Sequence, residues 1–314
     1  MIPYTALLRY NIYGFKVSPE AIATVLAFTV FFIYVASHLR KERFSKQIIN
    51  PREFAKFVLI IIVSSILGGR AWYYFIDLKW RGWSNIIWFI DLRNGEGLVS
   101  MGMILGGFIG LLIYVLFVMK EGKNSNWLIS LAKLADIIAP AIALYIFIFR
   151  LFGCSIVGDT IGTKTAVPWA LYWTKNGVPR HPTSFYLALK GLFIFFILRL
   201  FFSHKKIEKT RFRKRFDGEI ILWFLLLYCF NRLWIEFFRI GKQMYGPMNL
   251  VQWICLFLVI FLCQELFLKY YVIKKLRLNS LYKYADWIKA NTWLRQHKIF
   301  WQLLFKRDKN WHRM

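Results

Sequence analysis

The sequence predicts an all-α, polytopic membrane protein with about seven transmembrane helices. Of its 314 residues, 58% are hydrophobic and 19% are aromatic, and the mean hydropathy is +0.45. A soluble domain of this length carries more charge and fewer aromatic residues. Apolar runs of roughly 20 residues, the length that crosses a bilayer, recur along the chain. We therefore expect a helix bundle whose polar residues face its interior.

The predicted spans are separated by polar segments, and their ends carry tryptophan and tyrosine, as membrane anchors do. They cover residues 20–39, 53–76, 99–119, 128–152, 184–203, 218–239 and 248–268. The first run reads as a full span, so we expect no cleavable signal peptide. We expect one membrane domain with outer-face loops, residues 1–268, followed by a cytoplasmic tail, residues 269–314.

Basic residues predict the orientation. Lysine and arginine collect between the first two spans, between the fifth and sixth spans, and after Leu268. All three segments fall on one side of a chain with seven spans, and the segments on the other side are nearly balanced in charge. The positive-inside rule then puts the N-terminus outside and the C-terminus in the cytoplasm.

The formal net charge of +27 is compatible with either nucleic acid or membrane partners. Nucleic-acid binding needs a soluble basic face, which the chain lacks outside its tail, so we expect no nucleic-acid partner. The tail sets Trp287, Trp293 and Trp301 among basic residues, which predicts an amphipathic helix on anionic lipid. A solvated basic tail is the alternative.

The cysteines do not suggest a metal site. Cys154, Cys229, Cys255 and Cys263 form no Cys-x-x-Cys or Cys/His ligand spacing. We interpret them as small buried hydrophobic residues. We expect no metal and no redox or nucleotide cofactor.

Ionisable residues inside the sixth span are the clearest functional signal, because such groups are costly in a membrane unless they are paired or hydrated. Glu236 and Arg239 follow Arg232 by four and seven residues, which returns them to within about 40° of it on a helix. The three side chains form one stripe that faces the bundle interior. This stripe is either a local Arg–Glu–Arg ion network or part of an anion site.

Further polar residues lie near the outer ends of other spans. Glycines around Arg150 end its helix and let the backbone approach a ligand. Arg70 either lines the site or snorkels to the outer headgroups, and His181 alone would be an interfacial or capping group. Guanidinium groups at this depth suit a phosphate, so we expect a phospholipid headgroup as ligand. The arginines concerned are Arg70, Arg150, Arg180 and Arg239.

The ordered set of these segments resembles the prolipoprotein diacylglyceryl transferases over most of residues 1–262. The matching pieces are Tyr13-Gly14, Gly68-Gly69-Arg70-Ala71-Trp72-Tyr73-Tyr74, Gly97-Leu98-Val99, Asp136 with Ala139-Pro140, Pro168-Trp169-Ala170, Arg180-His181-Pro182-Thr183 with Tyr186, Arg232 with Glu236-Phe237-Phe238-Arg239, and Gln252.

The resemblance implies a multi-pass enzyme of the plasma (inner) membrane with its active site toward the outer side. Such an enzyme moves the diacylglyceryl group of phosphatidylglycerol onto the lipobox cysteine of a prolipoprotein signal peptide. The nucleophile belongs to the substrate, so the enzyme must hold the phosphate and help to remove the thiol proton. The implied partners are phosphatidylglycerol, the prolipoprotein and the lipid bilayer.

The resemblance also implies residue roles. Arg150 and Arg239 would hold the phosphoglycerol portion, and His181 or Asp159 would be the base; these four are the expected catalytic residues. The expected substrate-binding residues are Arg70, Asp136, Gly153, Cys154, Gly158, Gly162, Arg180, Tyr186, Arg232, Glu236 and Met101.

The chain departs from the family pattern at several places. Met101-Gly102-Met103 stands where relatives carry His or Tyr before Gly-Gly, and a thioether cannot relay a proton. Arg150 is displaced by one residue, which turns a helical side chain by about 100°, so we expect a local bulge to bring it inward. Ser184 and Leu187 replace the usual Gln and acid.

These departures keep two alternatives open. The chain could be a divergent relative that binds phospholipid or signal peptides without chemistry, or a transferase for another lipid or acceptor. A transporter or channel would be favoured by paired inverted halves with broken helices, and the sequence shows no such symmetry.

Overall fold

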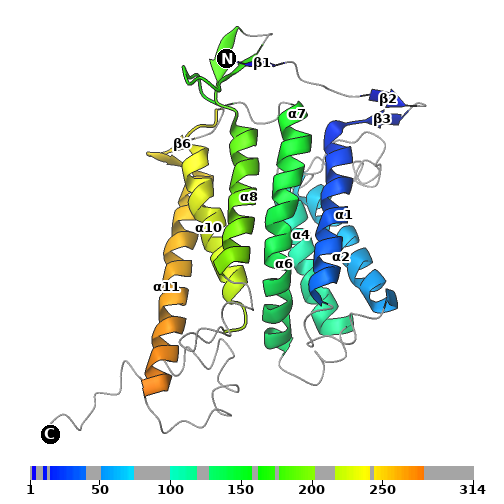
Figure 1. Ribbon diagram of the computed structural model, residues 1–314, viewed down its shortest axis with the longest axis vertical. Coiled ribbons are helices and arrows are strands. Elements are labelled where there is room, and N and C mark those ends of the chain that lie inside the picture. Colours follow the sequence, from blue (N-terminus) through cyan, green and yellow to red (C-terminus); the bar gives the residue numbers. More distant parts are fainter. Residues whose placement is uncertain are drawn as a thin grey trace, which may run out of the picture.

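The computed structural model describes residues 2–4, 10–12, 15–39, 51–73, 100–118, 127–157, 162–173, 177–201, 216–240 and 244–278. It is a bundle of helices with short strands gathered at one end, here named the loop end, and the opposite end is named the far end (Figure 1). The α-helices are α1 (Pro19–Leu39), α2 (Pro51–Trp72), α4 (Ser100–Ile113), α6 (Trp127–Phe149), α7 (Ser155–Val157), α8 (Thr183–Phe201), α10 (Glu219–Glu236) and α11 (Leu250–Leu278). Two π-helical turns, η4 (Tyr114–Val118) and η5 (Arg150–Cys154), extend α4 and α6.

A multi-pass, mainly helical membrane protein is confirmed, because each predicted span coincides with a helix. Within the described residues, five helices are long and apolar enough to cross a membrane: Pro19–Leu39, Pro51–Trp72, Trp127–Val157, Thr183–Leu200 and Leu250–Tyr271. The apolar helix Gly102–Val118 is shorter, and α10 carries two glutamates and an arginine. The number seven and the orientation of the termini therefore stay predictions.

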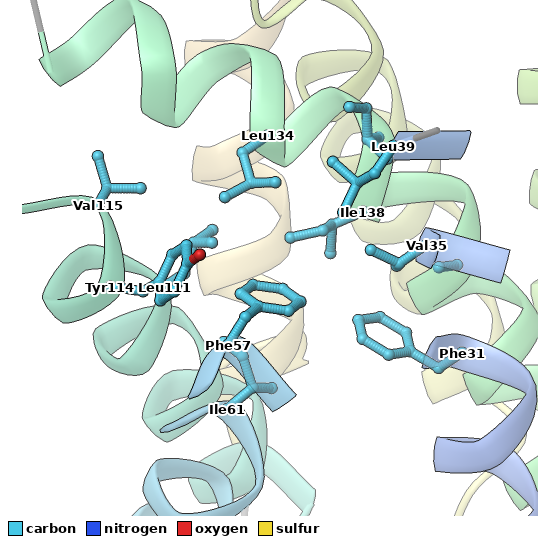
Figure 2. Packing of buried hydrophobic residues seen from close by; sticks show 12 residues of the cluster. Phe31, Val35, Leu39, Phe57, Ile61, Leu111, Tyr114, Val115, Leu134 and Ile138 are labelled. Atoms are coloured by element: carbon cyan, nitrogen blue, oxygen red, sulfur yellow. The ribbon is translucent and has the colours of Figure 1, made fainter. Parts of the chain in front are cut away.

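Helix α6 is the centre of the bundle, since it packs against α1, α8 and α10. Side chains of α1, α2, α4, η4 and α6 form one apolar cluster, in which Phe57 lies between Phe31, Tyr114 and Leu134 (Figure 2). A second cluster joins α6 to α8 and α10 through residues such as Ala143, Ile194 and Phe224. The two clusters fix the helices, and the charged residues of the predicted site lie outside them.

Small residues bring α2 and α4 together. Gly68 of α2 faces Gly102 and Gly106 of α4, and Ser64 of α2 faces Gly110. Close backbone packing through small residues is the usual way in which helices associate in lipid. The Gly-rich third span is thus explained by packing.

The short strands at the loop end were not predicted from the sequence. β1 (Ile2–Tyr4) runs parallel to β4 (Leu171–Trp173), which pairs antiparallel with β5 (Val178–Arg180). β2 (Tyr10–Ile12) with β3 (Phe15–Val17), and β6 (Met244–Tyr245) with β7 (Met248–Asn249), form two hairpins. These sheets connect the chain segments around the predicted site.

The predicted tail begins inside a helix. α11 continues past Leu268 to Leu278, and residues 279–314, where the amphipathic helix was expected, lie outside the described residues. The division into a membrane domain and a tail stays a prediction.

Candidate active site

The predicted bulge at Arg150 is confirmed, because α6 ends in the π-helical turn η5. A π-turn holds one more residue than an α-turn and often occurs at functional sites. The Ser155 amide donates to the Arg150 carbonyl five residues back, and the Ser155 hydroxyl donates to the same oxygen at 2.8 Å. The Arg150 guanidinium donates to the Cys154 sulfur at 3.4 Å. Gly153 packs against Ala23 of α1, which anchors the turn in the bundle.

Residues 162–165 lie as an extended segment between β5 and the end of α10. The Thr163 amide donates to the Phe238 carbonyl at 2.8 Å, and the His181 amide donates to the Thr163 carbonyl at 3.0 Å. Gly162 pairs with Arg239, and its carbonyl accepts from the Arg180 guanidinium at 3.3 Å. A Cβ at Gly162 would lie 2.6 Å from the His181 Cβ, so only glycine permits this approach. Arg180 thus shapes the loop that joins His181 to Arg239.

His181 is the end of a hydrogen-bonded chain of side chains. Trp169 donates to the Tyr186 hydroxyl oxygen at 2.8 Å, and that oxygen lies 3.1 Å from His181 Nδ1. The His181 ring packs on Phe238, with centroids 4.8 Å apart. Burial lowers the pKa of His181 below its ordinary value, which favours the neutral ring. Tyr186 orients this imidazole beside the end of α10.

The local Arg–Glu–Arg network, one of the two alternatives for the sixth span, is present. The side chain of Glu236 is fully buried, and its carboxylate lies 3.1 Å from Arg232 Nε and 3.2 Å from the nearest Arg239 nitrogen. Both arginine side chains keep some exposure, at 15% and 22%. The charges of Arg239, just after the end of α10, and of Arg150, in η5, also act on Arg232.

Lys190 joins this cluster, although sequence reasoning passed over it. The residue lies on α8 and is only 4% exposed. The positive charges of Arg232 and Arg150 act on its ammonium. The available signal was a single lysine in an otherwise apolar span, which is by default a functional candidate.

Asp136 lies apart from these arginines. Asp136 precedes Arg150 by 14 residues on the continuous helix, a separation of roughly 21 Å. Its carboxylate accepts from the amides of Gly218 at 2.9 Å and Ile221 at 3.0 Å, so it caps the start of α10 at the far end. Arg70 is buried near the end of α2, whose main partner is α4. A substrate-binding role for either residue stays a prediction.

Gln252 of the resemblance motif caps α11. Its side-chain oxygen accepts from the Asn249 backbone amide, and the Asn249 side-chain oxygen accepts from the Gln252 backbone amide, as in a capping box.

Gly158 and Asp159, two of the predicted site residues, lie outside the described residues. The side chain of Met101 does so as well, although its backbone belongs to α4.

The sequence of this chain matches a known protein family. The sequence profile described as prolipoprotein diacylglyceryl transferase matches residues 9–268. The chain belongs to the prolipoprotein diacylglyceryl transferase family. This match extends from before α1 to residue 268 inside α11, and it includes Arg150, Lys190, Arg232, Glu236 and Arg239.

Individual members of the prolipoprotein diacylglyceryl transferase family match this chain at low sequence identity but over most of its length. A phosphatidylglycerol–prolipoprotein diacylglyceryl transferase of Finegoldia magna is 29% identical over 254 residues, which is 81% of this chain and 91% of the relative. One of Campylobacter jejuni is 28% identical over 244 residues, covering 74% and 80%. One of Prochlorococcus marinus is 31% identical over 225 residues, covering 66% and 70%.

Proposed function

We propose that this chain transfers the diacylglyceryl group of phosphatidylglycerol to the lipobox cysteine thiol of prolipoproteins, in the plasma (inner) membrane and on its outer side. The observation that carries the proposal is the pairing of Arg232 and Arg239 with the buried carboxylate of Glu236, with Arg150 close enough for its charge to act on Arg232, inside a bundle of apolar helices. Guanidinium groups in such a place suit the phosphate of a lipid whose acyl chains remain in the membrane.

The proposed reaction is a substitution at a glyceryl carbon. The thiolate of the acceptor cysteine forms the new C–S bond while the C–O bond to phosphate breaks, and the electron pair leaves with glycerol phosphate. Arg150 and Arg239 bind the phosphate and offset the charge that grows on its leaving oxygen. Glu236 holds Arg232 and Arg239 in place for this task.

The thiol proton needs an acceptor. His181 suits this role because its ring is kept neutral by burial and oriented by Tyr186. Asp159 is the second candidate from the sequence. Arg180 and Gly162 support the base indirectly, because they fix the backbone on which His181 lies.

A second function is favoured by Met101. The family position next to Gly102 normally carries a proton-transferring side chain, and a thioether cannot replace it. A relative that binds phospholipid or signal peptide without chemistry, or that uses another lipid or acceptor, would retain the arginines and lose this group.

Mass spectrometry of a lipobox peptide distinguishes the two functions. The purified chain is incubated with phosphatidylglycerol and the peptide, and a diacylglyceryl mass gain on the cysteine is expected. A peptide with serine in place of the cysteine and the R150A variant are the controls, and neither should give product. Lipid binding without any mass gain would refute the transferase proposal and favour the second function.

A further inference from the structure

Lys190 is a buried cation that the proposed mechanism does not use. It follows Thr183, the first residue of α8, by seven positions, so it lies roughly 10 Å into the bundle from the loop end. Its surroundings are apolar, with Ala143 and Ile194 in the neighbouring cluster. A lysine ammonium in such a place needs a compensating group.

The described neighbours of Lys190 do not supply an anion. The ammonium nitrogen lies 3.7 Å from the ring centroid of Tyr228, a cation–π contact. Arg232 and Arg150 act on it with charges of the same sign. Among the described residues, no carboxylate forms an ion pair with Lys190.

The backbone prevents Lys190 from withdrawing from these neighbours. At the next residue, Gly191, α8 approaches α6 so closely that a Cβ would lie 2.8 Å from the Ala143 carbonyl oxygen. Both helices are held further by Ile194 and Leu198 in the shared apolar cluster. The ammonium is therefore held near Arg150, which extends from the same α6.

A second buried donor without an acceptor lies on α11, one turn before Cys255. Gln252 is 1% exposed, and its side-chain nitrogen has no hydrogen-bond partner. One turn further along α11, the Cys255 thiol contacts Cys229 of α10, and both cysteines act electrostatically on Lys190. A buried amide donor and a buried ammonium group can both be satisfied by a ligand that brings oxygen acceptors.

We propose that Lys190 binds the phosphate of an anionic phospholipid together with Arg150 and Arg232, and thereby makes this chain select net-negative headgroups over zwitterionic ones. The proposal rests on the proposed function for the identity of the lipid. A headgroup amine would add another cation beside three existing ones, whereas phosphatidylglycerol brings only the negative charge.

The test measures lipid binding without any acceptor peptide. The full-length chain is purified in detergent, offered equal amounts of phosphatidylglycerol and phosphatidylethanolamine, and analysed by native mass spectrometry. The wild type should retain phosphatidylglycerol preferentially. Lys190→Gln should lower that preference by at least about tenfold, because one buried charge contact is lost, and Lys190→Arg should keep it.

Lys269→Gln is the matched control, because Lys269 also contacts an aromatic ring, that of Phe216 at 4.7 Å, but among carboxylates. It should leave the lipid preference unchanged. Lys190→Gln should remain folded in lipid-free detergent, because the repulsion between cations that it removes offsets the cation–π contact that it loses. A folded Lys190→Gln protein with wild-type preference would overturn the proposal, as would a Lys190→Arg protein that loses the preference.

Binding of glycerol phosphate, measured in the same way, distinguishes a role of Lys190 in binding the lipid from a role in binding the free phosphate ester. If Lys190→Gln weakens binding of glycerol phosphate but leaves the lipid preference intact, Lys190 serves the leaving group and the proposal is wrong. A wild type that selects phosphatidylglycerol yet transfers nothing would refute the proposed function and leave the assignment of Lys190 standing.

Discussion

Two lysines that each lie over an aromatic ring have opposite electrostatic surroundings. Lys190 near the loop end and Lys269 near the far end each place an ammonium over an aromatic ring, at 3.7 Å and 4.7 Å from the centroid. The charges around Lys269 are carboxylates, among them Glu265 and Asp217. The charges around Lys190 are those of two arginines.

The contrast shows what each end of the bundle does. At the far end, Asp136 caps α10 and Glu219 accepts a hydrogen bond from the Tyr270 hydroxyl, so acids serve the protein's own groups. At the loop end, Arg232 and Arg239 share the carboxylate of Glu236, and the charges that act on Lys190 include those of two arginines. The acids of the far end stabilise the protein's own groups, and the positive charges of the loop end are what the proposed binding of a phospholipid phosphate requires.

The largest effect is expected at Glu236. Glu236→Ala removes the carboxylate that Arg232 and Arg239 share, and it should lower the free energy of unfolding by about 3–5 kcal/mol, the usual cost of breaking a buried ion pair. Chemical unfolding in detergent measures the change. Glu53→Ala is the control, because its partner Lys56 is 57% exposed and such pairs contribute less than about 1 kcal/mol. Equal losses at the two sites would contradict this view of Glu236.

Replacing Asp136 tests whether the far end contributes only to stability or also to lipid binding. Asp136→Ala should cost about 2 kcal/mol of stability, because it removes a carboxylate cap of a helix N-terminus. The folded protein should still bind phosphatidylglycerol as the wild type does. Normal stability with lost lipid binding would instead establish the substrate-binding role that the family resemblance implies.

Tyr228 should have a smaller effect. Tyr228→Leu removes the ring beneath the Lys190 ammonium and should destabilise the lipid-free protein by about 1–2 kcal/mol. Tyr228→Phe keeps the ring and should unfold like the wild type. If both variants lose the same stability, the hydroxyl group and not the ring is what matters.

The smallest change concerns the pH dependence of transfer. Since burial lowers the pKa of His181, the neutral base persists as the pH falls through 6.5, and activity is lost only as the pH passes the lower, folded-state value. A pH–rate profile should therefore show its acidic limb below the ordinary histidine range. Tyr186→Phe should move that limb, because it removes the hydroxyl 3.1 Å from Nδ1. An acidic limb that remains in a His181→Gln variant would assign the base elsewhere.

Periodicity and hydropathy were sufficient to predict the structural features that depend on a single helix. The spans follow from apolar length, and the stripe of Arg232, Glu236 and Arg239 follows from helical spacing, as their ion pairs now show. The bulge at Arg150 could be anticipated from a one-residue displacement, because a helical side chain cannot otherwise keep its direction.

Features that depend on two distant segments could not be predicted in this way. Asp136 caps a helix that begins 82 residues later, and nothing in its own span indicates that partner. The pairing of Gly162 with Arg239 uses backbone groups, which carry no side-chain pattern. Lys190 was visible as a lone charge, but its arginine neighbours come from other helices.

The wide turn at Arg150–Cys154 has a consequence for aligning relatives of this protein. A π-turn absorbs one additional amino acid locally, so the residues on either side of it can keep the directions they have in shorter homologues. An insertion inside a membrane helix would then be tolerated without rotating everything that follows. Alignments of the family should open a one-residue gap in this stretch, and numbering carried across it without that gap would misassign the neighbouring side chains.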